Sequence, residues 1–144
     1  MATVNVYLTF NGNTEEAFNF YKSVFGGEFS YIGRFKDMPV DENCPPLSEE
    51  EGNKIMHVSL PISKETVLMA SDSTNFSGEV TFGTNMSVSI NTATLEEAKH
   101  LFNGLSEKGK ITMPLEKTFW GAHFGMFTDQ FGIHWMVNYD EPQA

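Results

Sequence analysis

The sequence predicts an α+β protein made of two βαβββ repeats, and three observations predict this fold class. Some short stretches alternate apolar and polar residues, as half-buried strands do, and two others repeat apolar residues about every 3.6 positions, as amphipathic helices do. These stretches follow one another in the same order in both halves of the chain, which is typical of an internal repeat. The 144 residues suffice for one domain. We therefore expect a single domain over 1–144, with repeats at about 1–75 and 80–144.

The first repeat begins with a strand over residues 3–10, where apolar and polar side chains alternate. A helix follows, because Asn13 and Glu16 have the spacing of a capping box and Gly26-Gly27 supplies a helix end. The apolar face of this helix consists of Ala17, Phe20, Tyr21, Val24 and Phe25. Three further strands are expected over residues 28–35, 54–62 and 65–71.

The second repeat starts with an alternating strand over residues 85–91 and continues with a helix capped by Thr94 and Glu97. An offset of 81 positions carries the cap at Asn13 onto Thr94. Further along, an offset of 66 positions carries His57 onto His123. A last strand over residues 132–139 takes the place of 65–71. The apolar face of the second helix is Ala98, Leu101, Phe102 and Leu105, and Gly109 is expected to end it.

The two offsets differ by 15 residues, which predicts an insertion of that length in the first repeat, at residues 37–51. This segment has six carboxylates, no lysine or arginine, and three of the six prolines, so we expect a solvated loop without regular structure. A lid over a pocket is the alternative, because long ordered loops in compact domains are often functional. Cys44 lies in this segment without a basic neighbour and is interpreted as an unactivated thiol.

Composition excludes several classes of partner. With 9 Lys and Arg against 19 Asp and Glu, the formal charge is −10, which disfavours nucleic acids and anionic membrane surfaces. The single cysteine forms no internal disulfide, no leader segment opens the chain, and no apolar run is long enough to cross a bilayer, so we expect a cytoplasmic protein. The many Phe and Met residues fit a core built around a cavity.

Three segments carry a resemblance to a known family. They are EEAFNFYKSVFGGE in the first helix, KIMHVSLPI in the third strand and FWGAHFGMFTDQFGIHWMV near the end of the chain. Together with the doubled βαβββ order, they resemble the vicinal oxygen chelate superfamily, and most of all the PhnB-like branch of its glyoxalase, bleomycin-resistance and dioxygenase group. The resemblance covers nearly the whole chain. It departs from the family at Gln130, where relatives commonly have Pro.

The resemblance implies that each repeat forms a curved half-sheet with its helix on the convex side, that the two half-sheets enclose a cleft, and that the chain forms a homodimer. In each strand, the apolar set then faces the helix and the alternate set faces the cleft. The helix-facing set is Val4, Val6, Leu8, Met56, Val58, Leu60, Met86, Val88, Ile90, Phe124 and Met126. The cleft-facing set is Asn5, Tyr7, Thr9, His57, Ser59, Val67, Met69, Asn85, Ser87, Ser89, His123, Phe127, His134, Met136 and Asn138. Such a mixed wall suits a small organic ligand.

Metalloenzymes of this superfamily bind a divalent ion through His, Glu or Gln on four strands. The resemblance places those positions near Asn5, Met69, Asn85 and Met136. Neutral amide oxygens are weak ligands, and thioethers favour soft copper(I) over harder divalent ions. We therefore expect neither the standard metal centre nor another cofactor, with a divalent metal at some other position as the less favoured alternative.

His57 and His123 are the candidate catalytic residues, because they occupy equivalent places in the two repeats and alternation directs both toward the cleft. Two imidazoles in one cleft can bind a metal or act as acid and base near neutral pH. Alternatively, each histidine is simply hydrogen-bonded in place. Trp120 is a candidate for stacking on a planar ligand, or else belongs to the core. The candidate ligand-binding residues are Asn5, Tyr7, His57, Met69, Asn85, Ser87, Trp120, His123, Phe127 and Met136.

Three function classes remain open. The preferred one is a small-molecule-binding protein without the usual metal, of the kind that confers bleomycin resistance, since the charge of −10 suits cationic drugs. The alternatives are a metal-dependent glyoxalase or dioxygenase-type lyase or oxygenase that uses His57 and His123, and a ligand-free structural or regulatory dimer. Relatives also bear the name of a demethylubiquinone methyltransferase, but no glycine-rich loop here favours nucleotide or S-adenosylmethionine binding. The residues leave the ligand and any reaction open.

Overall fold

A computed structural model describes residues 2–39, 42–43 and 46–142. The chain divides into two compact units, Met1–Thr81 and Phe82–Ala144, and each is described by itself. Cys44, interpreted above as an unactivated thiol, lies outside the described residues. Among the residues that are described, no helix is long and apolar enough to span a membrane.

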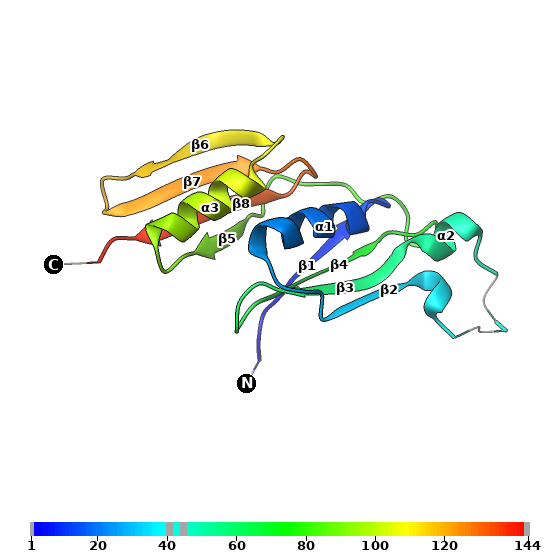
Figure 1. Cartoon of the computed structure of the whole chain (residues 1–144). Coiled ribbons are helices and arrows are strands. Elements are labelled where there is room, and N and C mark those ends of the chain that lie inside the picture. The colour runs from blue at the N-terminus through cyan, green and yellow to red at the C-terminus, as the bar shows by residue number, and fades with distance from the viewer. Residues whose placement is uncertain (1, 40–41, 44–45, 143–144) are drawn as a thin grey trace. The chain divides into compact units, whose positions relative to one another are not determined.

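The first unit is a four-stranded sheet with a helix packed on it (Figure 1). Its strand order is β1-β4-β3-β2, in which β1 runs parallel to β4 and the other pairs are antiparallel. Its elements are β1 (Val6–Phe10), α1 (Thr14–Phe25), β2 (Tyr31–Arg34), a 3-10 turn (Phe35–Asp37), α2 (Glu49–Asn53), β3 (Ile55–Pro61) and β4 (Val67–Asp72).

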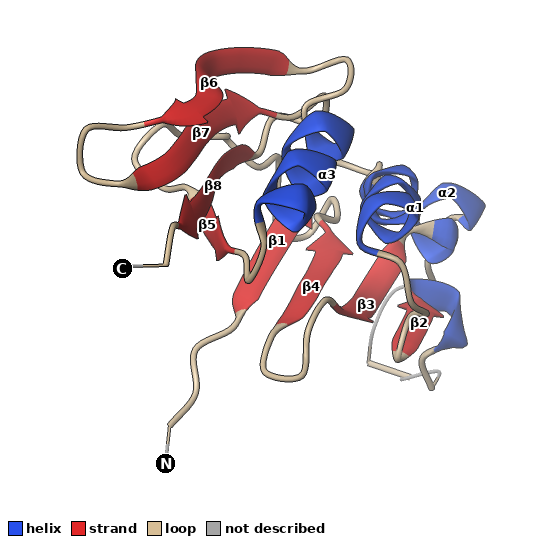
Figure 2. Ribbon diagram, turned by 60° about the vertical axis from the view of Figure 1, so that its left-hand side comes forward, coloured by secondary structure: helices blue, strands red, loops and turns tan. Residues whose placement is uncertain are grey.

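The second unit repeats this topology in its own sheet, with the order β5-β8-β7-β6 and a parallel β5–β8 pair. Its elements are β5 (Val88–Asn91), α3 (Leu95–Leu105), β6 (Lys110–Lys117), β7 (Ala122–Thr128) and β8 (His134–Asp140). The predicted α+β class with two βαβββ repeats is confirmed. The strands and helices of both units are distinguished by colour in Figure 2.

Each helix covers one face of the sheet of its own unit. In the first unit α1 contacts β3 and β4, and in the second unit α3 contacts β8. The apolar side chains between each helix and its sheet are removed from water, which stabilises each unit by about 25 cal/mol for every Å² of apolar surface buried. The fully buried apolar residues of the first helix and its sheet include Phe10, Ala17, Phe18, Tyr21, Val58, Leu60, Leu68 and Ala70.

The two helix starts differ in how they are capped. Thr94 caps α3 as expected, since its side chain accepts a hydrogen bond of 3.1 Å from the backbone N–H of Glu97. Asn13 was expected to cap α1, but its side chain makes no capping bond. Instead the carboxylate of Asp72, at the end of β4, accepts from the N–H groups of Gly12 and Thr14. A residue from a distant strand thus supplies the cap.

The insertion at 37–51 has more regular structure than expected. Helix α2 occupies Glu49–Asn53 and the 3-10 turn ends at Asp37, so the expectation of a segment without regular structure is wrong at both ends. Ser48 begins α2 by accepting a hydrogen bond from the N–H of Glu51. Three glutamates in the first turn face the positive end of the helix dipole, which stabilises this short helix.

Both first strands of the repeats start later than expected. Val4 and Met86, placed in the core by alternation, are 97% and 80% exposed, so those two assignments are wrong. β1 pairs with β4 only from Val6 onward, and β5 pairs with β8 only from Val88 onward. Alternation continues beyond the last ladder hydrogen bond and therefore does not mark where a strand begins. The expected inward residues Asn5, Asn85 and Ser87 accordingly lie outside the strands and are exposed.

The parity expected for β7 is wrong by one residue. Phe127 is 1% exposed and its ring packs edge-on against Phe102 of α3, at 5.2 Å between centroids. A β-carbon on Gly125 would lie 2.6 Å from the Phe102 ring, so Gly125 faces α3 as well. Phe124 and Met126 therefore lie on the opposite face, not in the helix-facing core. A shift of one residue exchanges the faces of a whole strand.

Candidate functional site

A row of four side chains crosses the first sheet on the face opposite α1. Tyr7 pairs with Met69, Met69 pairs with Ser59, and Ser59 pairs with Tyr31, so each of the four strands contributes one residue. The residues beside them in β3 and β4, including Val58 and Leu68, are buried under the helix. Alternation therefore directs the row to the open face. We call Tyr7, Tyr31, His57, Ser59 and Met69 the first-sheet cluster.

His57 lies between the two tyrosines of this cluster. Its ring stacks on Tyr7, with centroids 5.5 Å apart, and its centroid lies 5.8 Å from that of Tyr31. The Tyr7 hydroxyl lies 3.1 Å from Nδ1 of His57, and the Ser59 hydroxyl lies 2.9 Å from Nε2. Both ring nitrogens thus have a hydroxyl partner. The imidazole is held in one orientation by strands β1 and β3.

Gly33 makes room for Tyr31. It is the β2 residue that pairs with His57, and a β-carbon built on it would lie 2.5 Å from the Tyr31 hydroxyl oxygen. The tyrosine side chain therefore runs back along its own strand, over the glycine and toward the imidazole. Tyr31 was not among the site residues expected from the sequence. Because residues two positions apart in a strand share a face, the glycine at position 33 could have indicated that a tyrosine at position 31 has room to lie over it.

The open face of the first sheet carries no formally charged side chain in its described strands, although the whole chain has a charge of −10. Nearby charges are used elsewhere: Arg34 binds Glu15 on α1, and Asp72 binds Thr14. The residues of this face are Tyr7, Thr9, Tyr31, Gly33, His57, Ser59, Pro61, Val67, Met69 and Ser71. This surface is aromatic and polar but electrically neutral.

The equivalent row of the second sheet is dominated by methionine. Ser89 pairs with Met136, Met136 with Met126, and Met126 with Met113. Beyond this row, the Trp120 ring lies 6.3 Å from Phe124 and is 57% exposed. Methionine and aromatic side chains offer a soft apolar surface that adapts to a ligand. Trp120 and Met136, both expected at the site, share this surface.

His123 has different surroundings from His57. Its Nε2 lies 2.9 Å from Glu141, which also forms an ion pair with Lys117 at 3.2 Å. The hydrogen bond from His123, and then that from Lys117, lowers the pKa of the Glu141 carboxyl below its ordinary value. By alternation His123 shares the face of Gly125, on the α3 side of the sheet. The expected common parity of His57 and His123 is therefore wrong, and their local partners favour different roles.

The donors at the four positions that the resemblance assigns to a metal ion do not suit a hard divalent ion. Asn5 and Asn85 lie outside the strands, while Met69 and Met136 pair with Tyr7 and Ser89 on the open faces. Neutral amide oxygens are weak ligands, and thioethers are poor ligands for hard divalent ions. In the part of the chain that the structure describes, no three His, Cys, Asp or Glu side chains gather closely enough to hold a metal ion.

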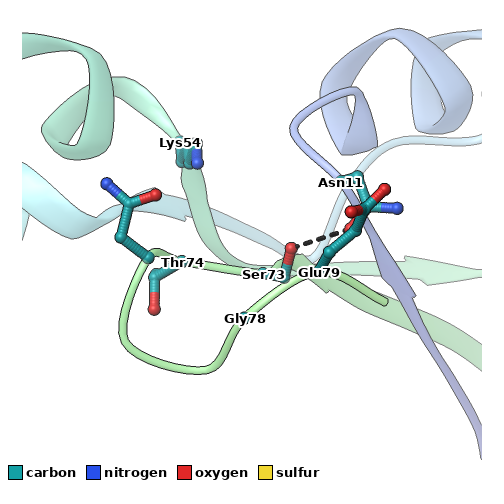
Figure 3. A pocket seen from close by; sticks show the side chains of 7 residues that line it. Asn11, Lys54, Ser73, Thr74, Gly78 and Glu79 are labelled. Atoms are coloured by element: carbon teal, nitrogen blue, oxygen red, sulfur yellow. Dashed lines mark hydrogen bonds between the residues drawn. The ribbon is translucent and has the colours of Figure 1, made fainter. Parts of the chain in front are cut away.

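A separate polar pocket of about 270 Å³ lies beside α2 and is lined by Asn11, Lys54, Ser73, Thr74, Asn75, Gly78 and Glu79 (Figure 3). Its principal polar groups already have partners. Lys54 binds Glu51 at 2.7 Å, and the Asn11 amide oxygen accepts from the Ser73 hydroxyl and from the N–H of Val80. The two bonds to Asn11 hold the loop after β4 beside the end of β1, which is a structural role.

The structure distributes the expected site residues among several environments. Tyr7, His57 and Met69 come together in the first-sheet cluster, and Trp120 and Met136 lie on the open face of the second sheet. Phe127 was expected to contact ligand, but it is in the core, so that assignment is wrong. Asn5, Asn85 and Ser87 precede their strands, and His123 lies with Glu141.

Comparison with known proteins gives consistent matches along the chain. Residues 2–138 match the family described as 3-demethylubiquinone-9 3-methyltransferase. Protein YjdN of Escherichia coli strain K12 is 34% identical over 137 residues, which are 92% of this chain and 91% of that protein.

Two solved structures share both sequence and fold with the chain. Protein PA1353 from Pseudomonas aeruginosa is 38% identical, with a TM-score of 0.81 and coverage of 99% of this chain and 100% of that one. The putative 3-demethylubiquinone-9 3-methyltransferase, PhnB protein, from Bacillus cereus is 29% identical, with a TM-score of 0.70 and coverage of 96% and 99%. The chain therefore belongs to the family described as 3-demethylubiquinone-9 3-methyltransferase.

Proposed function

We propose that this PhnB-like protein binds a small, uncharged, planar organic molecule without the divalent metal usual in its superfamily. The observation that carries the proposal is the first-sheet cluster, in which His57 lies between Tyr7 and Tyr31 on a face without formal charges. Aromatic rings bind planar ligands by stacking, and the hydroxyl groups supply the few polar contacts that orient them.

The charge distribution supports a neutral ligand over a cationic drug. A cation gains most from carboxylates at its binding face, but the acidic residues near this cluster are engaged elsewhere, as Glu15 is with Arg34. The net charge of −10 therefore does not carry over to the candidate ligand face. The bleomycin-resistance reading becomes the less favoured form of the binding function.

The metal-dependent alternative needs ligands of a kind that the inherited positions lack. It would have to use His57 and His123, whose nitrogen partners are hydroxyl groups in one case and Glu141 in the other. The proposal further treats 1–144 as one domain and includes a homodimer in the cytoplasm, as expected from the sequence. If no small molecule binds, the alternative function is that of a ligand-free structural or regulatory dimer.

Binding is tested by thermal shift with named probes, because a ligand that prefers the native state raises the melting temperature. We expect the uncharged probes catechol and 5-nitroindazole to raise Tm and cationic bleomycin to leave it unchanged. Elemental analysis of protein purified without a metal-affinity tag should find less than one divalent ion per chain. A stoichiometric ion, or a Tm shift with bleomycin alone, would contradict the proposal.

Two glycine-to-alanine substitutions test whether the ligand binds at the first-sheet cluster. In Gly33→Ala the new methyl group competes with the Tyr31 hydroxyl for the same space, and we expect 5-nitroindazole to bind about tenfold more weakly, the equivalent of about 1.4 kcal/mol. Gly83→Ala is the matched control, since its new methyl group would approach no atom closer than 3.4 Å. Titration calorimetry measures both. Equal weakening by the two substitutions would place the ligand elsewhere.

A further inference from the structure

A hydrogen-bonded chain runs along the open face of the first sheet, from an exposed tyrosine to a buried serine. It begins at the hydroxyl of Tyr7, a residue that is 48% exposed, and passes through both nitrogens of His57. It ends at Ser59, which is buried. The donor–acceptor distances are 3.1 Å at Nδ1 and 2.9 Å at Nε2.

This hydrogen-bonded chain has suitable partners for every protonation state of the His57 imidazole. A hydroxyl group can donate or accept, so Tyr7 and Ser59 can satisfy either neutral tautomer of His57 by rotation of their O–H bonds. When the ring carries both protons, the two N–H groups donate to the oxygens of Tyr7 and Ser59. The positive charge that develops on protonation is therefore stabilised by two hydroxyl oxygens that are already in place.

The charged groups of the neighbouring elements do not take part in this chain. The titratable side chains that share the face of His57 on β1 and β2 are Tyr7 and Tyr31. Beside β3, Lys54 binds Glu51, and at the end of β4 Asp72 binds Thr14 and the N–H of Ile55. The imidazole is thus the basic group of this face.

We propose that Tyr7, His57 and Ser59 form a proton relay that removes a proton from a ligand bound at the first-sheet cluster. This inference rests on the proposed function, since the ligand must lie against the exposed Tyr7 hydroxyl. In the step, a C–H bond of the ligand breaks and its proton passes to the Tyr7 oxygen. The Tyr7 O–H proton moves at the same time to Nδ1 of His57, and the electron pair stays with the ligand.

The relay requires no oxidant, reductant or second substrate. The Nε2–H of the resulting imidazolium donates to Ser59, and solvent removes the extra proton after the product leaves. The relay adds one requirement to the ligand of the proposed function. The ligand must be an uncharged planar molecule with one C–H acidified by an adjacent electron-withdrawing group. Tyr7 touches the ligand, and His57 receives the proton.

The probe for this activity is 5-nitrobenzisoxazole, an uncharged planar molecule. Loss of its ring C–H proton breaks the ring N–O bond and releases a coloured phenolate. We expect the protein to catalyse this opening, with a rate that rises from acidic toward neutral pH. Tyr7→Phe and His57→Gln should each lower kcat at least about a hundredfold, the lower end of the range for loss of a general base, with KM changed less than about threefold.

His100→Gln is the matched control, because it removes an imidazole from an exposed position of α3 in the other unit and should keep both the rate and its pH profile. Tyr7→Phe removes only an exposed hydroxyl group, so it tests the relay even if His57→Gln does not fold. Unreactive 5-nitroindazole measures binding independently in each variant. If it binds but the wild type opens the probe no faster than His57→Gln, the relay is refuted and binding stands. If it does not bind at all, the proposed function fails and the relay fails with it.

Discussion

Thr14 donates two hydrogen bonds to one oxygen of Asp72, from its backbone N–H at 3.0 Å and from its hydroxyl at 2.6 Å. The same oxygen accepts from Gly12, and the other carboxylate oxygen accepts from the N–H of Ile55 at 2.8 Å. Both Thr14 and Asp72 are buried. One carboxylate thus joins the start of α1 to the sheet that the helix covers.

Asp72→Ala should therefore destabilise the protein strongly, because it leaves the buried N–H groups of Thr14 and Ile55 without their acceptor. We expect a loss of about 2–4 kcal/mol in the free energy of unfolding, measured by urea denaturation. Asp140→Ala removes an exposed carboxylate at the end of β8 and should change stability by less than about 0.5 kcal/mol. Similar losses in the two variants would contradict the capping role of Asp72.

Glu51 makes stability depend on pH. The hydrogen bond from Lys54 is the largest cause that lowers the pKa of the Glu51 carboxyl below its ordinary value of 4.5, assisted by the backbone N–H of Asn75. A lowered pKa in the folded state stabilises the protein above the ordinary pKa, and this contribution is lost as the pH falls through the lowered value.

Glu51→Gln should accordingly reduce the free energy of unfolding near neutral pH, and the difference from wild type should shrink in acid. Urea denaturation in a pH series from neutral to below 4.5 measures this convergence. Glu50→Gln, one residue earlier at an exposed position of α2, is the matched control and should run parallel to wild type. A Glu51→Gln curve that stays parallel to wild type in acid would refute the linkage.

Phe127 and Trp120 were both expected to contact ligand, but the structure separates their roles. Phe127→Ala should cost about 3–5 kcal/mol, because it leaves a cavity against Phe102 in the core. Trp120→Ala should cost less than about 1 kcal/mol, because the Trp120 side chain is largely exposed. Thermal and urea denaturation compare the two variants. A larger loss for Trp120→Ala would reverse this assignment.

The repeat and its helices could be predicted from the sequence because their signals are local. The apolar spacing of each helix and the cap at Thr94 lie within about a dozen neighbouring residues, and the same spacing recurs at an offset of 81. These features depend on bonds to nearby positions, which a linear pattern records. The doubled order of strands and helices follows from them.

Strand register could not be predicted in the same way. The offset of 66 that aligned His57 with His123 fails by one residue, since the ladders place Val58 and Gly125, 67 positions apart, in equivalent pairs with Ala70 and Val137. The true counterpart of His57 is Phe124. Apolar residues occupy both faces of β7, so the pattern alone did not indicate which face meets the helix.

The sequence by itself determined the fold class and the two helices, because composition and local spacing contain this information. Only the tertiary structure decided that Asp72 caps a helix from a distant strand, that Phe127 is core, and that Tyr31 joins Tyr7 at His57. Those relationships depend on which residues the strand ladders bring opposite one another. Hydrogen bonds between segments far apart in the chain set that register.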